Sequence, residues 1–174
     1  MRSLTFEEVL AEGNRRSLGR AEEIVGIVIR HPDRFEELFD CIFSEDEIVR
    51  MRASDALEKV CRQRPDLFQP YTSTLLTEVS KINQPSVQWH LAQIIARLTL
   101  NTKDKATAIS VLKINLLQSK DWIVLNWTLD SLAKFALDDA RLRQWFIGVL
   151  RQYQGSDYKS IASRARKLLA QLEE

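Results

Sequence analysis

The stretch VRMRASDALEKV, residues 49–60, returns in altered form three more times along the chain. Segments beginning at Val87, Val124 and Ile161 carry mostly apolar residues at the same four positions, at offsets of 38, 37 and 37 residues. A fixed period of this length is typical of stacked helical repeats. Such a chain presents an extended surface rather than a pocket.

The composition supports an all-α protein. The 174 residues suit one domain and include only 5 Gly and 4 Pro, which leaves little room for strands and tight turns. The net charge is +1. The chain as a whole therefore has no strong field that would recruit nucleic acid or anionic lipid.

The sequence also predicts a cytoplasmic protein without membrane association. No apolar run reaches the roughly 18 residues that a membrane span needs. Residues 1–8 become acidic soon after their single arginine and lack the apolar core of a signal peptide. Cys41 and Cys61 lie on apolar helix faces and form no CxxC motif, so we expect buried, reduced thiols.

We expect a single domain over residues 1–174, made of a helical cap and four helix pairs. The cap is predicted at 1–31, and the repeats at about 32–62, 64–99, 103–136 and 139–172. Each repeat should contain an A helix followed by an antiparallel B helix. The expected pairs are about 33–43 with 46–62, 70–80 with 85–99, 104–117 with 120–136, and 139–153 with 157–172. The residues predicted to cap the B helices are Ser44, Asn83, Ser119 and Ser156.

The segment Asp46–Arg50, followed by Ala53–Leu57, is similar to the B helix of HEAT repeats. The likeness extends over residues 33–172 and is clearest in the first repeat, since Gln88, Leu125 and Ala162 stand where that repeat has Arg50. The resemblance implies a right-handed α–α superhelix whose B helices line the concave side. It implies scaffolding or recognition, but no single chemistry.

Equivalent outward positions of the B helices should then stack into ladders, because residues three and four apart share one helix face. The predicted ladders are Arg52, His90, Trp127 and Arg164; Asp55, Gln93, Asp130 and Lys167; and Lys59, Arg97, Lys134 and Gln171. Six Lys and Arg face two carboxylates around Trp127, a pattern that suits an acidic peptide or stacked single-stranded nucleic acid. The alternative is a solvated face held by the pairs Asp55–Lys59 and Asp130–Lys134.

The candidate binding residues are Arg52, Trp89, His90, Arg97, Trp127, Lys134, Arg164 and Lys167, with Trp127 as the anchor. Two other tryptophans have different expected roles. Trp145 is predicted in the core, and Trp122, like Trp89, is a candidate for packing between repeats.

Charge is unevenly distributed along the chain. Residues 33–47 have a net charge of −6 and residues 141–167 have +6. This pattern indicates either ordinary solvation, a partner steered to one end, or weak head-to-tail association of an otherwise monomeric protein.

The sequence contains no Walker loop, GxGxxG or HExxH motif, so we expect no catalytic residue, metal or cofactor. The prediction is a non-enzymatic module that binds another protein through its concave face. Two alternatives within the resemblance stay open. One is nucleic-acid binding of the HEAT-like DNA glycosylase type, with Trp127, Asp130 and Arg97 as nearest candidates whose spacing does not match that family's motif. The other is a bilin-lyase-type chaperone subunit.

Overall fold

The computed structural model describes residues 4–14 and 16–173, and this part of the chain is helical with no strand. The predicted all-α class is confirmed. The chain forms two compact units, unit 1 (residues 1–99) and unit 2 (residues 100–174). The continuous right-handed superhelix and the single domain over 1–174 stay predictions. Residues 1–3 and 15 of the predicted cap lie outside the described residues. The first three of them also belong to residues 1–8, which were compared with a signal peptide above.

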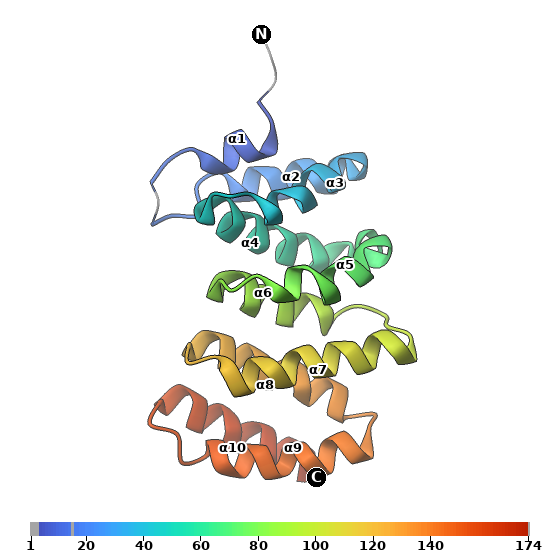
Figure 1. The fold of residues 1–174 in the computed structure, drawn as a ribbon, viewed down its shortest axis with the longest axis vertical. Helices are drawn as coiled ribbons and strands as arrows, with labels where there is room; N and C mark the ends of the chain where they lie inside the picture. Colours follow the sequence, from blue (N-terminus) through green and yellow to red (C-terminus); the bar gives the residue numbers. More distant parts are fainter. Residues whose placement is uncertain (1–3, 15, 174) are drawn as a thin grey trace. The chain divides into compact units, whose positions relative to one another are not determined.

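Unit 1 is built around its longest helix, α4. Its α-helices are α1 (Phe6–Ala11), α2 (Ala21–Arg30), α3 (Phe35–Asp40), α4 (Glu47–Gln63), α5 (Thr72–Thr77) and α6 (Pro85–Ile95). Its 3₁₀ helices are η1 (Pro32–Arg34), η2 (Cys41–Phe43), η3 (Pro65–Tyr71) and η4 (Val79–Lys81). Helix α4 packs between α2 and α6, and α1 lies against α4 and α3 (Figure 1).

Unit 2 is built around α8. Its helices are α7 (Thr102–Gln118), α8 (Trp122–Ala136), α9 (Ala140–Tyr153) and α10 (Lys159–Glu173). Helix α8 contacts α7, α9 and α10, and α9 packs along α10 (Figure 1). The B helices of the four pairs are therefore α4 and α6 in unit 1, and α8 and α10 in unit 2.

The repeating apolar positions form the core of both units. Val49 and its counterparts at positions 87, 124 and 161 are all at most 1% exposed. Of the sixteen positions that the period aligns, all but Phe135 are buried. The period therefore identified the buried face of every B helix, because burial follows the helical repeat of 3.6 residues.

The A helices of unit 1 are shorter than predicted. The expected helices at 33–43 and 70–80 are divided into a central α-helix of six residues with 3₁₀ turns on either side. In the second of them, Pro70 and Tyr71 belong to the 3₁₀ helix η3, and the α-helix begins only at Thr72. Helix α6 also ends at Ile95, before the predicted residue 99.

The three B helices with predicted serine caps each begin three residues after that serine. The hydroxyls of Ser44, Ser119 and Ser156 each accept a hydrogen bond from the amide two residues ahead, at 3.1–3.2 Å. The caps of α4 and α8 are instead Asp46 and Asp121, whose carboxylates accept from the first-turn amides. Each serine thus closes the turn before the helix, which is the local bonding that favours Ser in turns. The predicted Asn83 cap is also wrong, since Gln84 precedes α6 and makes no capping bond.

The side chain of Arg50 links α4 to the start of α6. Its guanidinium donates to the Gln84 amide oxygen at 2.7 Å and to the carbonyls of Ser44 and Glu45. The Gln84 amide donates back to the carbonyl of Glu47 at 2.8 Å. These bonds satisfy carbonyl groups at the helix entry and join the two repeats of unit 1.

Both cysteines are buried and free, as the sequence predicts for their side chains. Burial raises the pKa of the Cys41 thiol and of the Cys61 thiol to about 12. Neither forms the thiolate that nucleophilic or redox chemistry requires at neutral pH.

Candidate functional site

The first predicted ladder residue, Arg52, does not face solvent. It is fully buried, and its guanidinium donates to the carbonyls of Leu10, Glu12, Asn14 and Ser17 at 2.5–3.0 Å. The carbonyls of these four residues, which lie at the end of α1 and between α1 and α2, replace water around the cation. The prediction of an outward Arg52 is therefore wrong, and this residue has a structural role.

The next cations of unit 1 are neutralised by acids. The Glu58 carboxylate is 2% exposed and lies between Arg62, at 2.8 Å, and Arg97, at 2.7 Å. Arg97 also donates to the carbonyl of Gln93. A partner could not engage Arg97 without leaving the buried Glu58 partly unpaired, which is costly.

Lys59 is held in the same way. Its ammonium pairs with Asp55 at 2.9 Å and with Glu22 of α2. The predicted i,i+4 pair of Asp55 and Lys59 is therefore present, but Asp55 is buried, so this position is neither a solvated face nor a free binding cation. The roles of Glu58 and Glu22 were not predicted, although the i,i+4 spacing of Glu58 and Arg62 in the sequence indicates an ion pair for the first of them.

His90 lies in a buried polar cluster between α4 and α6. The Ser54 hydroxyl is 3.0 Å from Nδ1, the Trp89 indole N–H donates to Nε2 at 3.0 Å, and an Asp55 oxygen is 3.7 Å from Nε2. Because the indole can only donate, Nε2 accepts and the ring proton is on Nδ1. Burial lowers the pKa of His90, and the nearby carboxylates of Asp55 and Glu58 offset this only in part.

This serine, histidine and aspartate set does not form a hydrolytic site. Ser54 is fully buried, so no substrate can reach its hydroxyl. The histidine nitrogen that would be oriented by a carboxylate is occupied by Trp89. The cluster instead satisfies buried polar groups where α4 meets α6. His90 is therefore not the exposed binding residue that was predicted, and Trp89 beside it is half-buried.

Unit 2 presents a different surface. Trp127, Asp130 and Lys134 follow one another along one side of α8, and Arg164 of α10 pairs with Asp130 at 3.0 Å. Lys134 and Lys167 are exposed and form no ion pair among the described residues. Trp127 is 36% exposed. We refer to Trp127, Lys134, Arg164 and Lys167 as the unit 2 B-face.

The electrostatics of this face are cationic. Burial raises the pKa of Asp130, and the opposing effects of Arg164, Lys134 and Lys167 do not cancel it. The positive charges of Arg164, Lys134 and Lys167 thus all act on the Asp130 carboxylate. One acid therefore faces three cations, and two of the cations are available for a partner.

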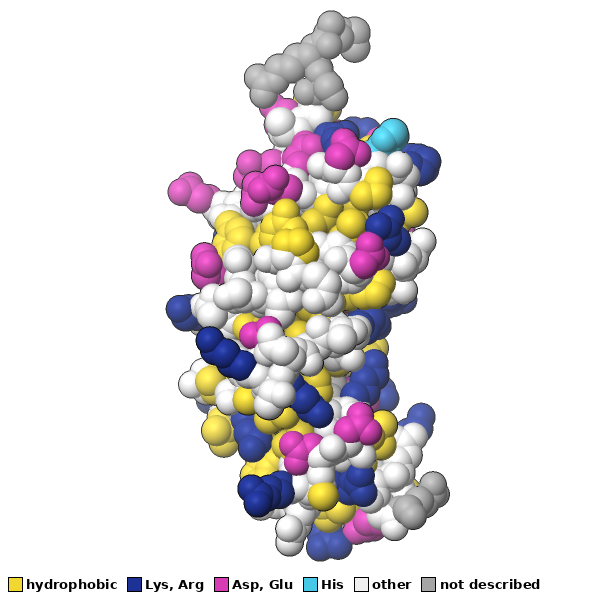
Figure 2. Space-filling model, turned by 90° about the vertical axis from the view of Figure 1, so that its right-hand side faces the viewer, with side chains coloured by type: hydrophobic (Ala, Val, Ile, Leu, Met, Phe, Trp, Pro, Cys, Tyr) yellow, Lys and Arg dark blue, Asp and Glu magenta, His cyan; other side chains and the backbone are white. Residues whose placement is uncertain are grey.

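The charge of the two units differs in sign. Unit 1 holds 13 Lys and Arg against 16 Asp and Glu, and unit 2 holds 12 against 8, so their formal charges are −3 and +4. Figure 2 shows Asp and Glu gathered over the N-terminal part of unit 1. An acidic partner is therefore attracted to unit 2 and repelled by unit 1.

The other two tryptophans of unit 2, Trp145 and Trp122, are also exposed. Trp145 is 40% exposed, so its predicted place in the core is wrong; Lys113 of α7 lies 4.1 Å from the centroid of its ring. The buried stripe of α9 is formed instead by Leu142, Phe146 and Leu150. Trp122, at the first position of α8, is 47% exposed.

A family model described as the HEAT repeat domain matches residues 8–112, which is more than half of the chain. The chain belongs to the HEAT repeat family. Modules of this family are generally non-enzymatic and mediate protein interactions. Neither a search of curated proteins nor a search of solved structures gave a match.

The HEAT match and the basic surface occupy different parts of the chain. The matched residues cover most of unit 1 and the first part of α7, while the unit 2 B-face follows at positions 127–167. Within residues 4–14 and 16–173, no group of three or more His, Cys, Asp and Glu is placed to hold a metal ion. In the same part of the chain, every helix is too short or too polar to cross a membrane.

Proposed function

We propose that this HEAT repeat protein is a non-enzymatic interaction module, and that the unit 2 B-face binds an acidic segment of another protein. The observation that carries the proposal is the combination of an exposed Trp127 with Lys134 and Lys167, two cations that form no ion pair with the described residues. In unit 1 the equivalent positions are closed by internal ion pairs.

Trp127 supplies the anchor of this site. A tryptophan offers a large apolar area with an N–H donor, and such residues dominate the binding energy of many interfaces. The cations around it set the orientation of an acidic partner and its association rate. We therefore expect Trp127 to supply most of the affinity for the partner, and Lys134 and Lys167 to supply the selectivity for an acidic segment.

We expect Trp127→Ala to weaken partner binding by about 2 kcal/mol without unfolding the chain. The assay is capture of partners from nuclease-treated lysate, followed by affinity measurement with the captured protein. Trp145→Ala is the matched control, since it removes a tryptophan of similar exposure from α9. Equal loss in both variants, or a large fall in melting temperature for Trp127→Ala, would contradict the proposal.

The charge-reversal pair Lys134→Glu and Lys167→Glu tests the class of partner. Both should weaken binding of an acidic protein, while Lys103→Glu on α7 should not. Nucleic acid would instead show loss of the captured partner on nuclease treatment and a steep, log-linear fall of affinity with salt. That result would replace the protein partner by nucleic acid.

A further inference from the structure

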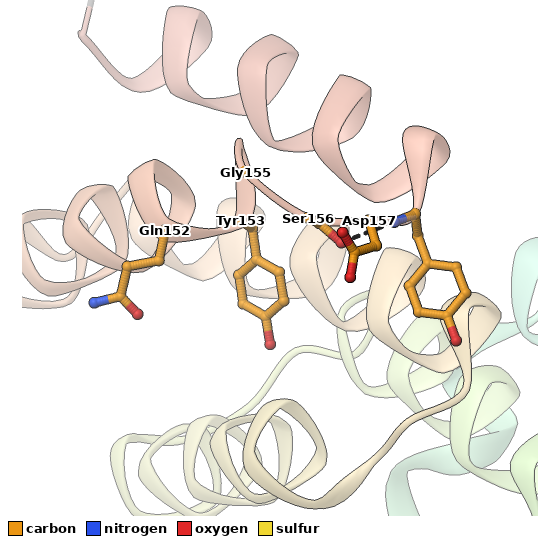
Figure 3. A pocket seen from close by; sticks show the side chains of 6 residues that line it. Gln152, Tyr153, Gly155, Ser156 and Asp157 are labelled. Atoms are coloured by element: carbon orange, nitrogen blue, oxygen red, sulfur yellow. Dashed lines mark hydrogen bonds between the residues drawn. The ribbon is translucent and has the colours of Figure 1, made fainter.

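The turn between α9 and α10 forms an open pocket within unit 2. Its volume is about 400 Å³, and it is lined by Gln152, Tyr153, Gly155, Ser156, Asp157 and Tyr158 (Figure 3). None of these residues belongs to the unit 2 B-face. The pocket is polar and aromatic, and its only charged group is Asp157.

Two hydrogen bonds hold the walls of this pocket. The Tyr153 hydroxyl donates to the carbonyl of Leu116 at 3.2 Å, which ties the ring on α9 to α7. The backbone amide of Tyr158 donates to the Ser156 hydroxyl at 3.2 Å, which sets the turn before α10. Tyr158 itself is 50% exposed. One ring is therefore anchored and the other is accessible from solvent.

The carboxylate of Asp157 is free to receive a ligand. It is exposed and forms no ion pair with any described residue, including Lys159 two positions further along the chain. Figure 3 shows the Tyr153 ring on the side of the turn where the Asp157 carboxylate also lies. The two tyrosine rings form no ring contact with each other among the described residues, and both line the pocket together with Asp157.

The chemistry of this lining selects a cation. The faces of phenol rings carry partial negative charge and attract ammonium or guanidinium groups. A guanidinium is planar, stacks on aromatic faces, and pairs with a carboxylate through two parallel hydrogen bonds. We propose that the pocket binds an arginine side chain presented by another protein. This site takes the opposite charge to the unit 2 B-face, and it does not depend on the function proposed for that face.

The probe for this site is N-acetyl-arginine amide, titrated into the full chain and followed by the NMR signals of the tyrosine rings. We expect the Tyr153 and Tyr158 signals to shift in a saturable way. N-acetyl-citrulline amide has nearly the same shape without the charge, and should give no saturable shift. Equal shifts with citrulline, or no shift with arginine, would overturn the proposal.

Substitutions of the lining residues test whether the arginine probe binds in this pocket. Tyr158→Ala and Asp157→Asn should each weaken arginine binding by about threefold, in line with exposed cation–π and ion-pair interactions. Tyr158→Phe keeps the ring face and should bind as the unmodified chain does. Asp138→Asn, which neutralises an exposed acid in the turn before α9, is the control for charge. Binding that survives Asp157→Asn unchanged, or that falls equally in Asp138→Asn, would show that the arginine does not sit in this pocket.

Discussion

Arg52 stabilises unit 1 although it is a fully buried cation with no carboxylate partner among the described residues. Its charge is shared by four backbone carbonyls, two of which, Leu10 and Glu12, lie at the C-terminal end of α1. Unsatisfied carbonyls at a helix end carry partial negative charge and favour a cation. The Arg52 side chain thus binds the end of α1 and the carbonyls of Asn14 and Ser17 to α4.

We expect Arg52→Met to lower the free energy of unfolding of unit 1 by about 3 kcal/mol, because four buried carbonyls lose their donor. Urea unfolding followed by circular dichroism measures the loss. Arg30→Met, at an exposed arginine of α2, serves as the control and should change stability by less than about 0.5 kcal/mol. A similar small effect for both variants would mean that water replaces the Arg52 donors.

His90 should make unit 1 sensitive to acid. Burial lowers the pKa of His90 in the folded chain below its usual value of 6.5, so the unfolded chain takes up the proton first as the pH falls. The stability that depends on neutral His90 is therefore complete above pH 6.5 and decreases below it, until the pH reaches the pKa of the folded state. Three charged groups also face this histidine. Asp55 and Glu58 act to raise the pKa of His90 and Lys59 acts to lower it, but burial is the largest effect.

The measurement is urea unfolding of the chain between pH 8 and pH 5. His90→Gln should flatten the decrease in stability over this range, whereas His31→Gln, which replaces the exposed histidine, should leave it in place. An unchanged pH profile in His90→Gln would assign the acid sensitivity to other groups.

At the scale of elements, two glycines show how local conformation and packing decide the effect of one methyl group. Gly148 lies inside α9, and a Cβ there would meet nothing within 4 Å. Gly19 precedes α2 with a φ of +54°, and a Cβ there would lie 3.0 Å from the Arg52 guanidinium carbon. The first position is free for a side chain and the second is not.

We expect Gly148→Ala to stabilise the protein by about 0.5–1 kcal/mol, because alanine loses less backbone entropy in a helix. Gly19→Ala should destabilise it by about 1–3 kcal/mol, since it strains the backbone and presses on Arg52. Thermal unfolding of the two single variants compares them directly. The same sign of change in both would contradict the description of one of these sites.

At the scale of the whole molecule, the ion pairs and the buried polar clusters are divided between the two units. The separate interactions of Arg52, Glu58 and His90 lie within unit 1, and the Asp130–Arg164 pair lies within unit 2. In repeat proteins, stability is close to a sum of local terms, and regions can open separately.

A destabilised unit 1 should therefore open without unit 2. In native-state hydrogen exchange, Arg52→Met should raise the exchange rates of amides in α2 and α4 more than those in α8 and α10. Gly148→Ala, as the counterpart in unit 2, should slow exchange in α9 and leave α4 unchanged. Equal acceleration in all helices for Arg52→Met would show that the two units unfold as one.

The sequence by itself determined the all-α class, the four B helices and the buried face of each, because the spacing of apolar residues along a helix is a local property. The tertiary structure alone decided which outward positions remain open. Arg52 is covered by the segment whose Leu10, Glu12, Asn14 and Ser17 carbonyls accept its hydrogen bonds, and Arg97 is paired with the buried Glu58, so neither is a free binding cation. Trp127, Lys134 and Lys167 keep their exposure because no other segment among residues 100–173 covers them. Exposure depends on segments that are distant in sequence, and a repeat period contains no information about which of these segments fold back over a given helix face.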